Sequence, residues 1–315
     1  MRFSHRIINA LVGIGLHITA TLSLAQAREL GRWLGRFYYR FDSAGRRVAE
    51  RNIALAYPEL SLSEQDELVR ACLEETGALA CEMGHVWVKP WEYSRQLMTD
   101  VEGADLVQAA LGEGQGVIIL GPHLGNWEVL GLHLATLGEM VALYEPPKIS
   151  ALGDRIKTAR ERSGGRLVPT TARGLAALVK SVKGGGISGI LPDQVPEQAS
   201  GGRNVPFMGV PCATAALGCN LINRSGAIAF MGAALRVPGG FKVRYVPAPS
   251  ALYGDDEEAA LTAMNDAVEE LIRGWDAQYQ WLYKRFRQRP VDQPKRYNQL
   301  KVPRAQFTRT PESTV

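Results

Sequence analysis

The sequence has few cysteines, and their spacing indicates neither a metal site nor a disulfide framework. The 315 residues include only Cys72, Cys81, Cys212 and Cys219. None forms a C-x-x-C pair, and none lies near a histidine at a zinc-binding spacing. This usage favours buried free thiols in a reducing compartment and argues against a secreted domain held together by disulfides.

The chain also lacks repeated long apolar runs, internal repeats and a strong net charge. Its mean hydropathy is −0.10, whereas several spans of about 20 apolar residues would raise that value well above zero. A polytopic membrane protein is therefore excluded. The formal charge of +4 neither favours nor excludes nucleic acid as a partner, and 46% hydrophobic with 22% charged residues is typical of a globular protein.

One uncharged stretch, residues 7–27, dominates the start of the chain. Arg2 and Arg6 precede it and Arg28 follows it, and its length is close to the roughly 20 residues that cross a bilayer. Several polar residues within it weaken that interpretation. Three interpretations stay open, namely an uncleaved N-terminal membrane anchor, a soluble core helix, and a signal peptide cleaved after the run Ala25–Ala27. Its length favours the anchor.

Arginines recur at every fourth position directly after this stretch, at Arg28, Arg32, Arg36 and Arg40. On a helix they form one stripe, with Trp33 and other apolar side chains beside or opposite it. A basic face with aromatic neighbours is typical of a helix that lies on an anionic bilayer surface. We therefore predict a membrane anchor and a basic amphipathic helix over residues 1–45.

The rest of the chain reads as an α/β domain. Residues 61–85 indicate a helix with a capping box between Ser61 and Glu64. From about residue 101, short apolar runs alternate with helical stretches, which predicts a mixed, partly parallel sheet flanked by helices. We expect this domain to cover residues 46–303 and a polar tail to cover residues 304–315.

Residues 117–130 join an apolar strand to a helix through a short turn. Gly121 and Pro122 end the strand, and Asn126 can cap the helix that follows. His123 therefore lies at the carboxyl end of a strand, where open α/β sheets bind ligands. Five residues separate it from Glu128, so the two side chains can meet only if the histidine is on the loop and the glutamate in the first helical turn.

A histidine paired with a carboxylate is the basic unit of general-base catalysis. No serine or cysteine adjoins His123 and Glu128 in the sequence, so we infer that the histidine activates a hydroxyl group of the substrate. A structural histidine and a metal-ligand pair remain alternatives. Metal is disfavoured because no second histidine or carboxylate joins the pair and the H-E-x-x-H pattern is absent. We predict neither a metal nor a cofactor.

The segment from His123 to Glu128, HLGNWE, is similar to the signature of the bacterial lipid A biosynthesis acyltransferases, the late lauroyl and myristoyl transferases. These are distant relatives of the glycerolipid acyltransferases with a His-x4-Asp motif. The similarity extends over nearly the whole chain, since further segments resemble family elements in the same order: Arg51–Leu60, Tyr144–Lys148, Leu191–Gln194, Val205–Gly209 and Gln278–Arg287.

The resemblance implies transfer of a fatty acyl chain, usually from acyl carrier protein, to a hydroxyl of a lipid A precursor. It implies that His123 is the general base and Glu128 its partner. Arg160 falls where the family has a functional arginine, although Arg162 is close enough to compete. An arginine near the histidine could hold a lipid phosphate or stabilise an oxyanion. The candidate substrate-binding residues are Arg160, Asp193, Lys148 and Asn126.

Basic and aromatic residues also gather in residues 281–304. They could contact anionic headgroups or an acidic carrier protein, whereas nucleic acid is disfavoured because no nucleic-acid motif accompanies them. We expect a bacterial inner-membrane protein with a single N-terminal anchor and a catalytic domain on the cytoplasmic side. The expected partners are acyl carrier protein, a glycolipid acceptor and the anionic membrane surface. Alternatives are an acyltransferase for a glycerolipid or aminolipid, and a non-catalytic lipid-binding protein.

Overall fold

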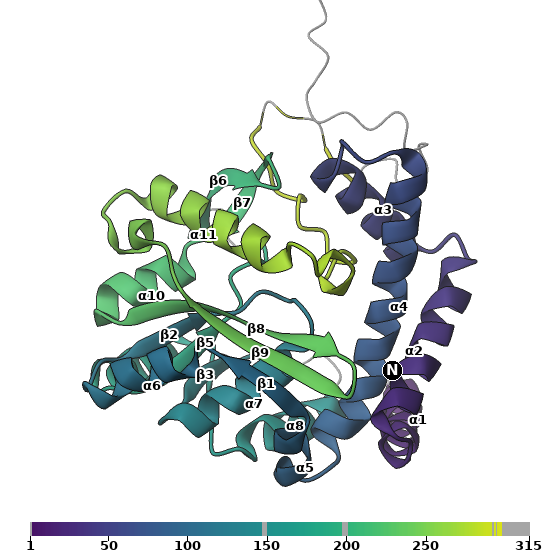
Figure 1. Ribbon diagram of the computed structural model, residues 1–315, viewed down its shortest axis with the longest axis horizontal. Coiled ribbons are helices and arrows are strands. Elements are labelled where there is room, and N and C mark those ends of the chain that lie inside the picture. Colours follow the sequence, from purple (N-terminus) through teal and green to yellow (C-terminus); the bar gives the residue numbers. More distant parts are fainter. Residues whose placement is uncertain (1, 147–149, 197–200, 292, 294, 298–315) are drawn as a thin grey trace, which may run out of the picture.

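A computed structural model describes residues 2–146, 150–196, 201–291, 293 and 295–297. Helices of the N-terminal third lie beside a central mixed sheet that further helices flank (Figure 1). The predicted tail over residues 304–315 lies outside the described residues. All four cysteines are buried and free, which confirms the prediction from their spacing.

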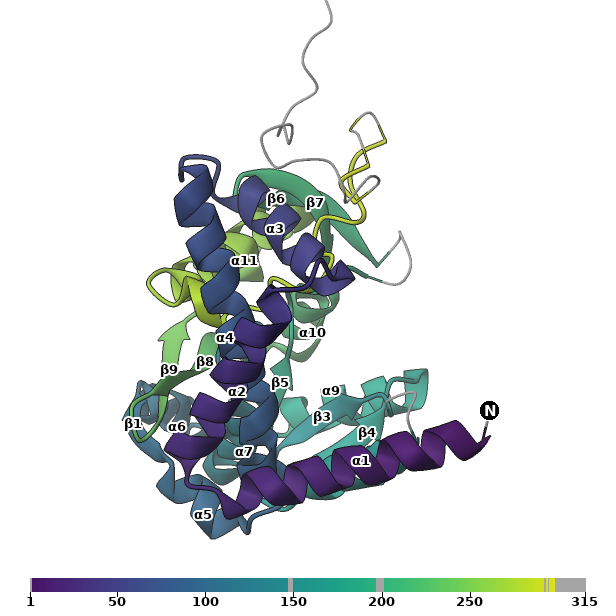
Figure 2. The same ribbon diagram turned by 90° about the vertical axis from the view of Figure 1, so that its right-hand side faces the viewer.

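Close helix packing organises the N-terminal part of the chain. Figure 2 shows α2 running alongside α4, with α1 crossing near the end of α4. A Cβ atom at Gly31 of α2 would lie 2.3 Å from the carbonyl oxygen of Gly77 in α4, so only glycine permits this approach. The helix bounds are α1 (Arg2–Thr21), α2 (Leu24–Tyr39), α3 (Ala44–Ala56), α4 (Leu62–Trp87) and α5 (Trp91–Gln96). The capping box predicted between Ser61 and Glu64 begins α4.

The uncharged stretch over residues 7–27 is not one helix. The α1 helix ends at Thr21, and Ser23 begins α2 with a capping box that it forms with Gln26. Among the described residues, no helix combines the length and the apolar character that a membrane crossing requires. The expectation of one helix over residues 7–27 is therefore corrected, because a helix start falls inside the stretch.

The arginine stripe of α2 faces the protein. Arg28, Arg32 and Arg36 form ion pairs with Glu82, Glu75 and Glu74 of α4. The exposed face of α2 carries Trp33, Leu34, Phe37 and Tyr38 instead. The prediction that the basic face lies on the bilayer is therefore wrong, since carboxylates of a neighbouring helix bind three of its four arginines.

The central sheet has the strand order β1-β9-β8-β2-β5. Three of its four strand pairs are parallel, and β8 with β9 forms an antiparallel hairpin. This confirms the predicted mixed, partly parallel sheet. The strands are β1 (Met98–Glu102), β2 (Val117–Leu120), β5 (Ile187–Ile190), β8 (Ile228–Val237) and β9 (Gly240–Pro247).

Both faces of the central strand β2 are buried. Ile118 and Leu120 pack into one apolar core, and Val117 and Ile119 pack into the other, as the alternation of side chains along a strand requires. The remaining elements are α6 (Ala104–Gly112), α7 (Trp127–Leu137), β3 (Val141–Tyr144), α8 (Ser150–Glu161), β4 (Arg166–Pro169), α9 (Ala172–Lys183), β6 (Gly202–Phe207), β7 (Val210–Ala215), α10 (Leu217–Ser225) and α11 (Glu257–Ile272). The burial of β2 fixes the position of the loop that leaves its carboxyl end.

Candidate active site

The loop between β2 and α7 has the predicted strand–turn–helix form. Asn126 caps α7, because its side-chain oxygen accepts a hydrogen bond from the Val129 amide at 3.2 Å. Gly125 has φ +60°, and a Cβ atom there would lie 2.2 Å from the carbonyl oxygen of Ala234. Glycine is therefore the residue that this turn accepts.

Backbone hydrogen bonds hold this loop against two distant segments. The Asn126 amide donates to the carbonyl of Ala234 in β8 at 2.7 Å, and the Gly125 amide donates to the carbonyl of Gln278 at 3.1 Å. The amide of Gln280 donates to the carbonyl of His123 at 3.1 Å. The position of His123 thus depends on β8 and on the segment around residues 278–280.

His123 pairs with Asp193, which follows β5 in the chain. Its Nδ1 lies 2.8 Å from Asp193 Oδ1, and its backbone amide donates to Asp193 Oδ2 at 2.8 Å. Both side chains are buried. The predicted pairing of His123 with Glu128 is therefore corrected, because the carboxylate that contacts the histidine comes from a residue far along the chain.

The Asp193 contact determines the tautomer of His123. Burial raises the pKa of Asp193, but the facing imidazole and its hydrogen bonds, together with the Arg285 charge, hold that pKa below its usual value. An ionised carboxylate only accepts hydrogen bonds, so we assign the ring proton to Nδ1. The lone pair of Nε2 then accepts a hydrogen bond from the side-chain amide of Gln194, at 3.1 Å. Nε2 is the atom of this ring that can act as a base.

Glu128 binds Arg160 in a bidentate ion pair. Arg160 Nε donates to Glu128 Oε2 at 2.9 Å, and Arg160 Nη2 donates to Oε1 at 2.6 Å. The indole nitrogen of Trp87 also donates to Glu128 Oε2, at 3.2 Å. Burial lowers the pKa of Arg160, but the adjacent carboxylate outweighs that effect and raises it. Arg162 instead donates to the carbonyls of Trp87 and Lys89, so Arg160 is the arginine that reaches Glu128.

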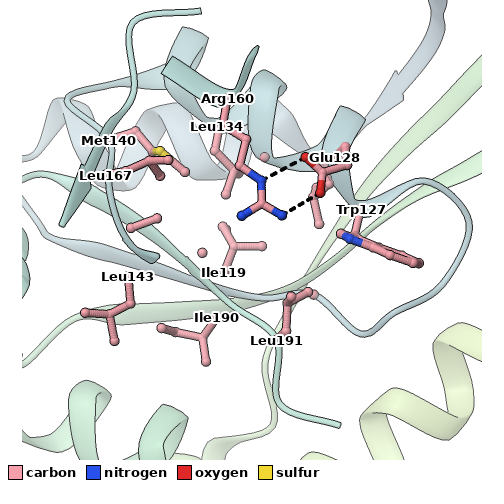
Figure 3. A pocket seen from close by; sticks show the side chains of 15 residues that line it. Ile119, Trp127, Glu128, Leu134, Met140, Leu143, Arg160, Leu167, Ile190 and Leu191 are labelled. Carbon is pink, nitrogen blue, oxygen red and sulfur yellow. Dashed lines mark hydrogen bonds and ion pairs between the residues drawn. The ribbon is translucent and has the colours of Figure 1, made fainter. Parts of the chain in front are cut away.

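The Glu128–Arg160 pair lines an apolar pocket. Figure 3 shows the guanidinium of Arg160 lying between Glu128 and the apolar side chains. The space not filled by atoms is about 660 Å³, its open mouth included. Trp127 lines the pocket and also contacts the ring of His123, with a centroid distance of 4.9 Å. The large apolar lining residues are Ile119, Leu130, Leu134, Met140, Leu143, Leu167, Ile190 and Leu191.

Comparison with known proteins shows the family of this chain. The sequence model of the family described as bacterial lipid A biosynthesis acyltransferase matches residues 1–288. This chain belongs to that family. The match confirms the resemblance found in the sequence, and it makes the protein an enzyme, an acyltransferase of lipid A biosynthesis.

Several curated relatives of the acyltransferase match it over most of their length. It is 27% identical over 296 residues to the lipid A biosynthesis lauroyltransferase of Escherichia coli K12, covering 91% of this chain and 94% of the relative. It is 27% identical over 272 residues to the palmitoleoyltransferase of the same organism, covering 85% and 87%. A lipid A biosynthesis acyltransferase of Haemophilus influenzae is 26% identical over 279 residues, covering 84% and 85%.

Two residues that were predicted to bind substrate, Lys148 and Asn126, are not among the described residues that line the pocket of the acyltransferase. Lys148 lies outside the described residues. Asn126 is fully buried, and both ends of its side-chain amide bind protein groups, namely the Val129 amide and Glu82 Oε2. Asn126 therefore lies inside the protein and not on the pocket wall, which corrects the expectation that it contacts substrate.

Sequence reasoning missed three residues around the His123–Asp193 pair. Gln194 contacts the base nitrogen, the buried Tyr279 has its pKa raised by burial and by the nearby Asp193, and Arg285 adds a buried positive charge nearby. Arg285 belongs to the closing basic segment, and its guanidinium donates to the Ala213 carbonyl at 2.6 Å. All three lie in segments that resemble family elements, which was the available signal. Within the described residues, no cluster of three or more histidine, cysteine or acidic side chains could hold a metal ion.

Proposed function

We propose that the enzyme moves a fatty acyl chain from acyl carrier protein to a hydroxyl of a lipid A precursor, with His123 as the general base. The observation that carries this proposal is the buried His123–Asp193 pair, which Trp127 connects to an apolar pocket whose lining includes the Glu128–Arg160 ion pair. The relatives named above, a lauroyltransferase and a palmitoleoyltransferase, support a fatty acyl chain as the transferred group.

The first step is proton transfer to Nε2 of His123. The acceptor hydroxyl replaces the Gln194 amide at Nε2, and its oxygen attacks the carbonyl carbon of the acyl thioester as Nε2 takes the proton. The carbonyl electron pair moves to the oxygen and forms a tetrahedral oxyanion. Asp193 stabilises the imidazolium that results, because its ionised carboxylate faces Nδ1 at 2.8 Å.

The second step expels the carrier thiol. The oxyanion reforms the carbonyl, the carbon–sulfur bond breaks, and the imidazolium returns its proton to the departing sulfur. The ester product and the free thiol of the carrier leave, and His123 is neutral again. No covalent intermediate on the enzyme is required, because the histidine only carries a proton from the hydroxyl oxygen of the acceptor to the sulfur of the carrier thiol.

Arg160 and Glu128 serve the charged part of the reaction. A guanidinium on the wall of an apolar pocket can bind a phosphate of the acceptor or stabilise the oxyanion. An unpaired cation in apolar surroundings would be costly, so Glu128 balances its charge and fixes its direction through two hydrogen bonds. Glu128 therefore acts on Arg160, and the apolar lining residues accommodate the acyl chain.

The test is an assay of purified enzyme in detergent with acyl carrier protein thioesters of several chain lengths and a lipid A precursor. We expect ester formation by the wild type and almost none by His123→Ala. Full activity of that variant would overturn the role of His123. A wild type that transfers acyl groups only to a glycerolipid or aminolipid, or to nothing, would overturn the proposed acceptor or the proposed activity. Mass spectrometry of lipids from a deletion strain gives the acceptor and chain length independently.

The enzyme attaches to the cytoplasmic side of the bacterial inner membrane through the apolar faces of α1 and α2. Leu11, Ile14 and Ile18 of α1 are more than half exposed. On α2 and just after it, Trp33 stacks on Phe37 at 5.9 Å and Phe37 contacts Phe41 at 5.0 Å. A helix with large apolar and aromatic side chains on its exposed face can lie in the plane of the bilayer interface.

Vesicle flotation tests this attachment. Because the arginines of α2 face inward, we expect binding to neutral phosphatidylcholine vesicles that persists at high salt. The double substitution of Trp33 and Phe37 by serine should weaken that binding about tenfold or more, whereas Leu106→Ser, an exposed apolar position on α6, should not. Binding that requires anionic lipid and disappears in salt would favour a basic contact surface instead.

A further inference from the structure

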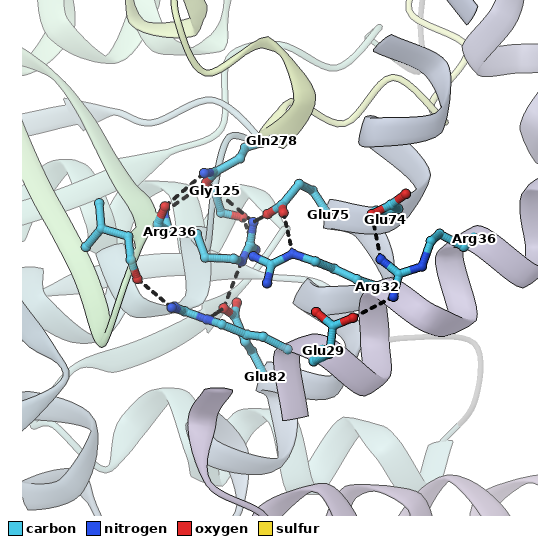
Figure 4. A network of polar contacts seen from close by, with 11 residues as sticks. Glu29, Arg32, Arg36, Glu74, Glu75, Glu82, Gly125, Arg236 and Gln278 are labelled. Atoms are coloured by element: carbon cyan, nitrogen blue, oxygen red, sulfur yellow. Dashed lines mark hydrogen bonds and ion pairs between the residues drawn. The ribbon is translucent and has the colours of Figure 1, made fainter. Parts of the chain in front are cut away.

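A fully buried carboxylate, Glu82 of α4, lies at the centre of a polar network next to the active-site loop (Figure 4). Its Oε1 accepts hydrogen bonds from Arg28 Nε at 2.5 Å and from Arg236 Nε at 2.8 Å. Its Oε2 accepts a hydrogen bond from the side-chain amide of Asn126 at 3.0 Å. A buried carboxylate is costly to desolvate, and these three donors compensate that cost.

Two contacts of the network reach the loop between His123 and Glu128. Asn126 uses its amide nitrogen for Glu82 and its amide oxygen for the first turn of α7, the turn that carries Glu128. Arg236, which Glu82 also holds, donates to the carbonyl of Gly125 at 3.3 Å. Glu82 thus fixes the backbone that sets the positions of the base and of the arginine-binding carboxylate relative to each other.

A third contact extends the network to α2. Arg28 donates to Glu82 and also to the carbonyls of Val237 and Gly240, at 2.5 Å and 2.8 Å. Its guanidinium lies over the ring of Phe241, 4.9 Å from the centroid. The helix that carries the exposed aromatic residues is therefore bound to the same carboxylate as the active-site loop.

We propose that Glu82 is a positioning residue for acyl transfer, which holds the loop from His123 to Glu128 in place through Asn126. Through Arg28, the position of this loop also depends on the position of α2. The proposal rests on the proposed function. Reacting groups must be held within a fraction of an ångström of their productive positions, so a loop that moves slightly loses rate while substrate binding changes little. Through this network, contact of α2 with the bilayer can affect the position of the active-site loop.

An exchange of the two side chains is the sharpest test. Glu82→Gln and Asn126→Asp each disrupt the contact, the second by placing two carboxylates together. The double variant exchanges carboxylate and amide, so the hydrogen bond and the net charge are both retained. We expect each single substitution to lower kcat on the order of 10- to 100-fold with little change in KM for the acyl donor, and the double variant to recover most of the loss. The proposal would be overturned if the single variants had the kcat of the wild type, or if the loss of kcat in the double variant equalled the product of the two single losses.

Two arginines of α2 provide a matched comparison. Arg28 reaches Glu82, whereas the ion pairs of Arg36 among the residues that the structure describes are with Glu74 of α4 and Glu29 of α2. We expect Arg28→Met to lower kcat and Arg36→Met to leave it unchanged. Equal losses in both would indicate general support of α2 and overturn the role of Arg28.

The outcomes separate this proposal from the proposed function. If the wild type transfers no acyl group, the proposed function fails, and crystal structures of the wild type and of Asn126→Asp then measure the loop directly. An unmoved loop in that variant would overturn the positioning role. If Glu82→Gln does not fold, because the buried Arg28 and Arg236 lose the carboxylate that they share, the charge-balanced exchange and the Arg28 comparison still decide.

Discussion

His123 and Glu128 begin and end the same six-residue segment, yet they face different partners. His123 uses Nδ1 to bind Asp193 and keeps Nε2 for chemistry. Both carboxylate oxygens of Glu128 accept hydrogen bonds from Arg160 and Trp87. One end of the segment therefore handles protons and the other end holds a positive charge, so the spacing of the motif reflects two sites and not one bonded pair.

The largest effect is expected at the histidine end. Asp193→Asn keeps the shape of the side chain but removes the carboxylate that fixes the Nδ1–H tautomer, so we expect kcat to fall on the order of 10³- to 10⁴-fold. The acid limb of the pH–rate profile should move as well. The comparison breaks if Glu128→Gln produces the same loss and the same change in the pH profile, because Glu128 would then be the functional partner of His123.

A smaller loss is expected at the glutamate end. Arg160→Lys keeps the charge but cannot donate two parallel hydrogen bonds, and Glu128→Gln leaves the arginine without its counter-charge. We expect each to lower kcat on the order of 10²- to 10³-fold without moving the acid limb of the pH–rate profile. Arg162→Lys is the matched control, since Arg162 binds backbone carbonyls and is not among the residues that line the pocket. A loss in that control as large as in Arg160→Lys would remove the special role of Arg160.

The local structure of the segment could be predicted from the sequence, whereas the long-range partner of His123 could not. The turn from β2 into α7 follows from adjacent residues, because Gly121 and Pro122 end a strand and Asn126 caps a helix. The partner of His123 is 70 residues away in the chain, and nothing in the spacing of His123 and Glu128 excludes their pairing. Strand order had to bring Asp193 to the end of β2 before the true pair could be seen.

The arginine stripe shows the same limit in another form. A four-residue period places Arg28, Arg32 and Arg36 on one face of α2 but does not say whether that face meets lipid or protein. The missing information is on α4, where Glu75 and Glu82 are seven residues apart and so share a helix face. Acidic residues with a matching period on α4 are the signal that favours ion pairs between the two helices.

The smallest effect separates the catalytic histidine from a structural one nearby. His133 of α7 is buried, its Nδ1 contacts the hydroxyl of Tyr245 at 2.7 Å, and burial lowers its pKa to about 4. Its folded pKa lies below the unfolded value of about 6.5, so the stability gained by keeping it neutral is complete above pH 6.5 and is lost as the pH falls toward 4. We expect the loss to reach up to about 3 kcal/mol in the free energy of unfolding.

Urea unfolding between pH 7 and pH 4.5 should therefore show a smaller decrease of the free energy of unfolding in His133→Gln than in the wild type, with acyl transfer at pH 7.5 retained. If the free energy of unfolding of the variant fell between pH 7 and pH 4.5 as much as that of the wild type, this account of His133 would be contradicted. A loss of activity as large as in Asp193→Asn would place His133 with the catalytic groups.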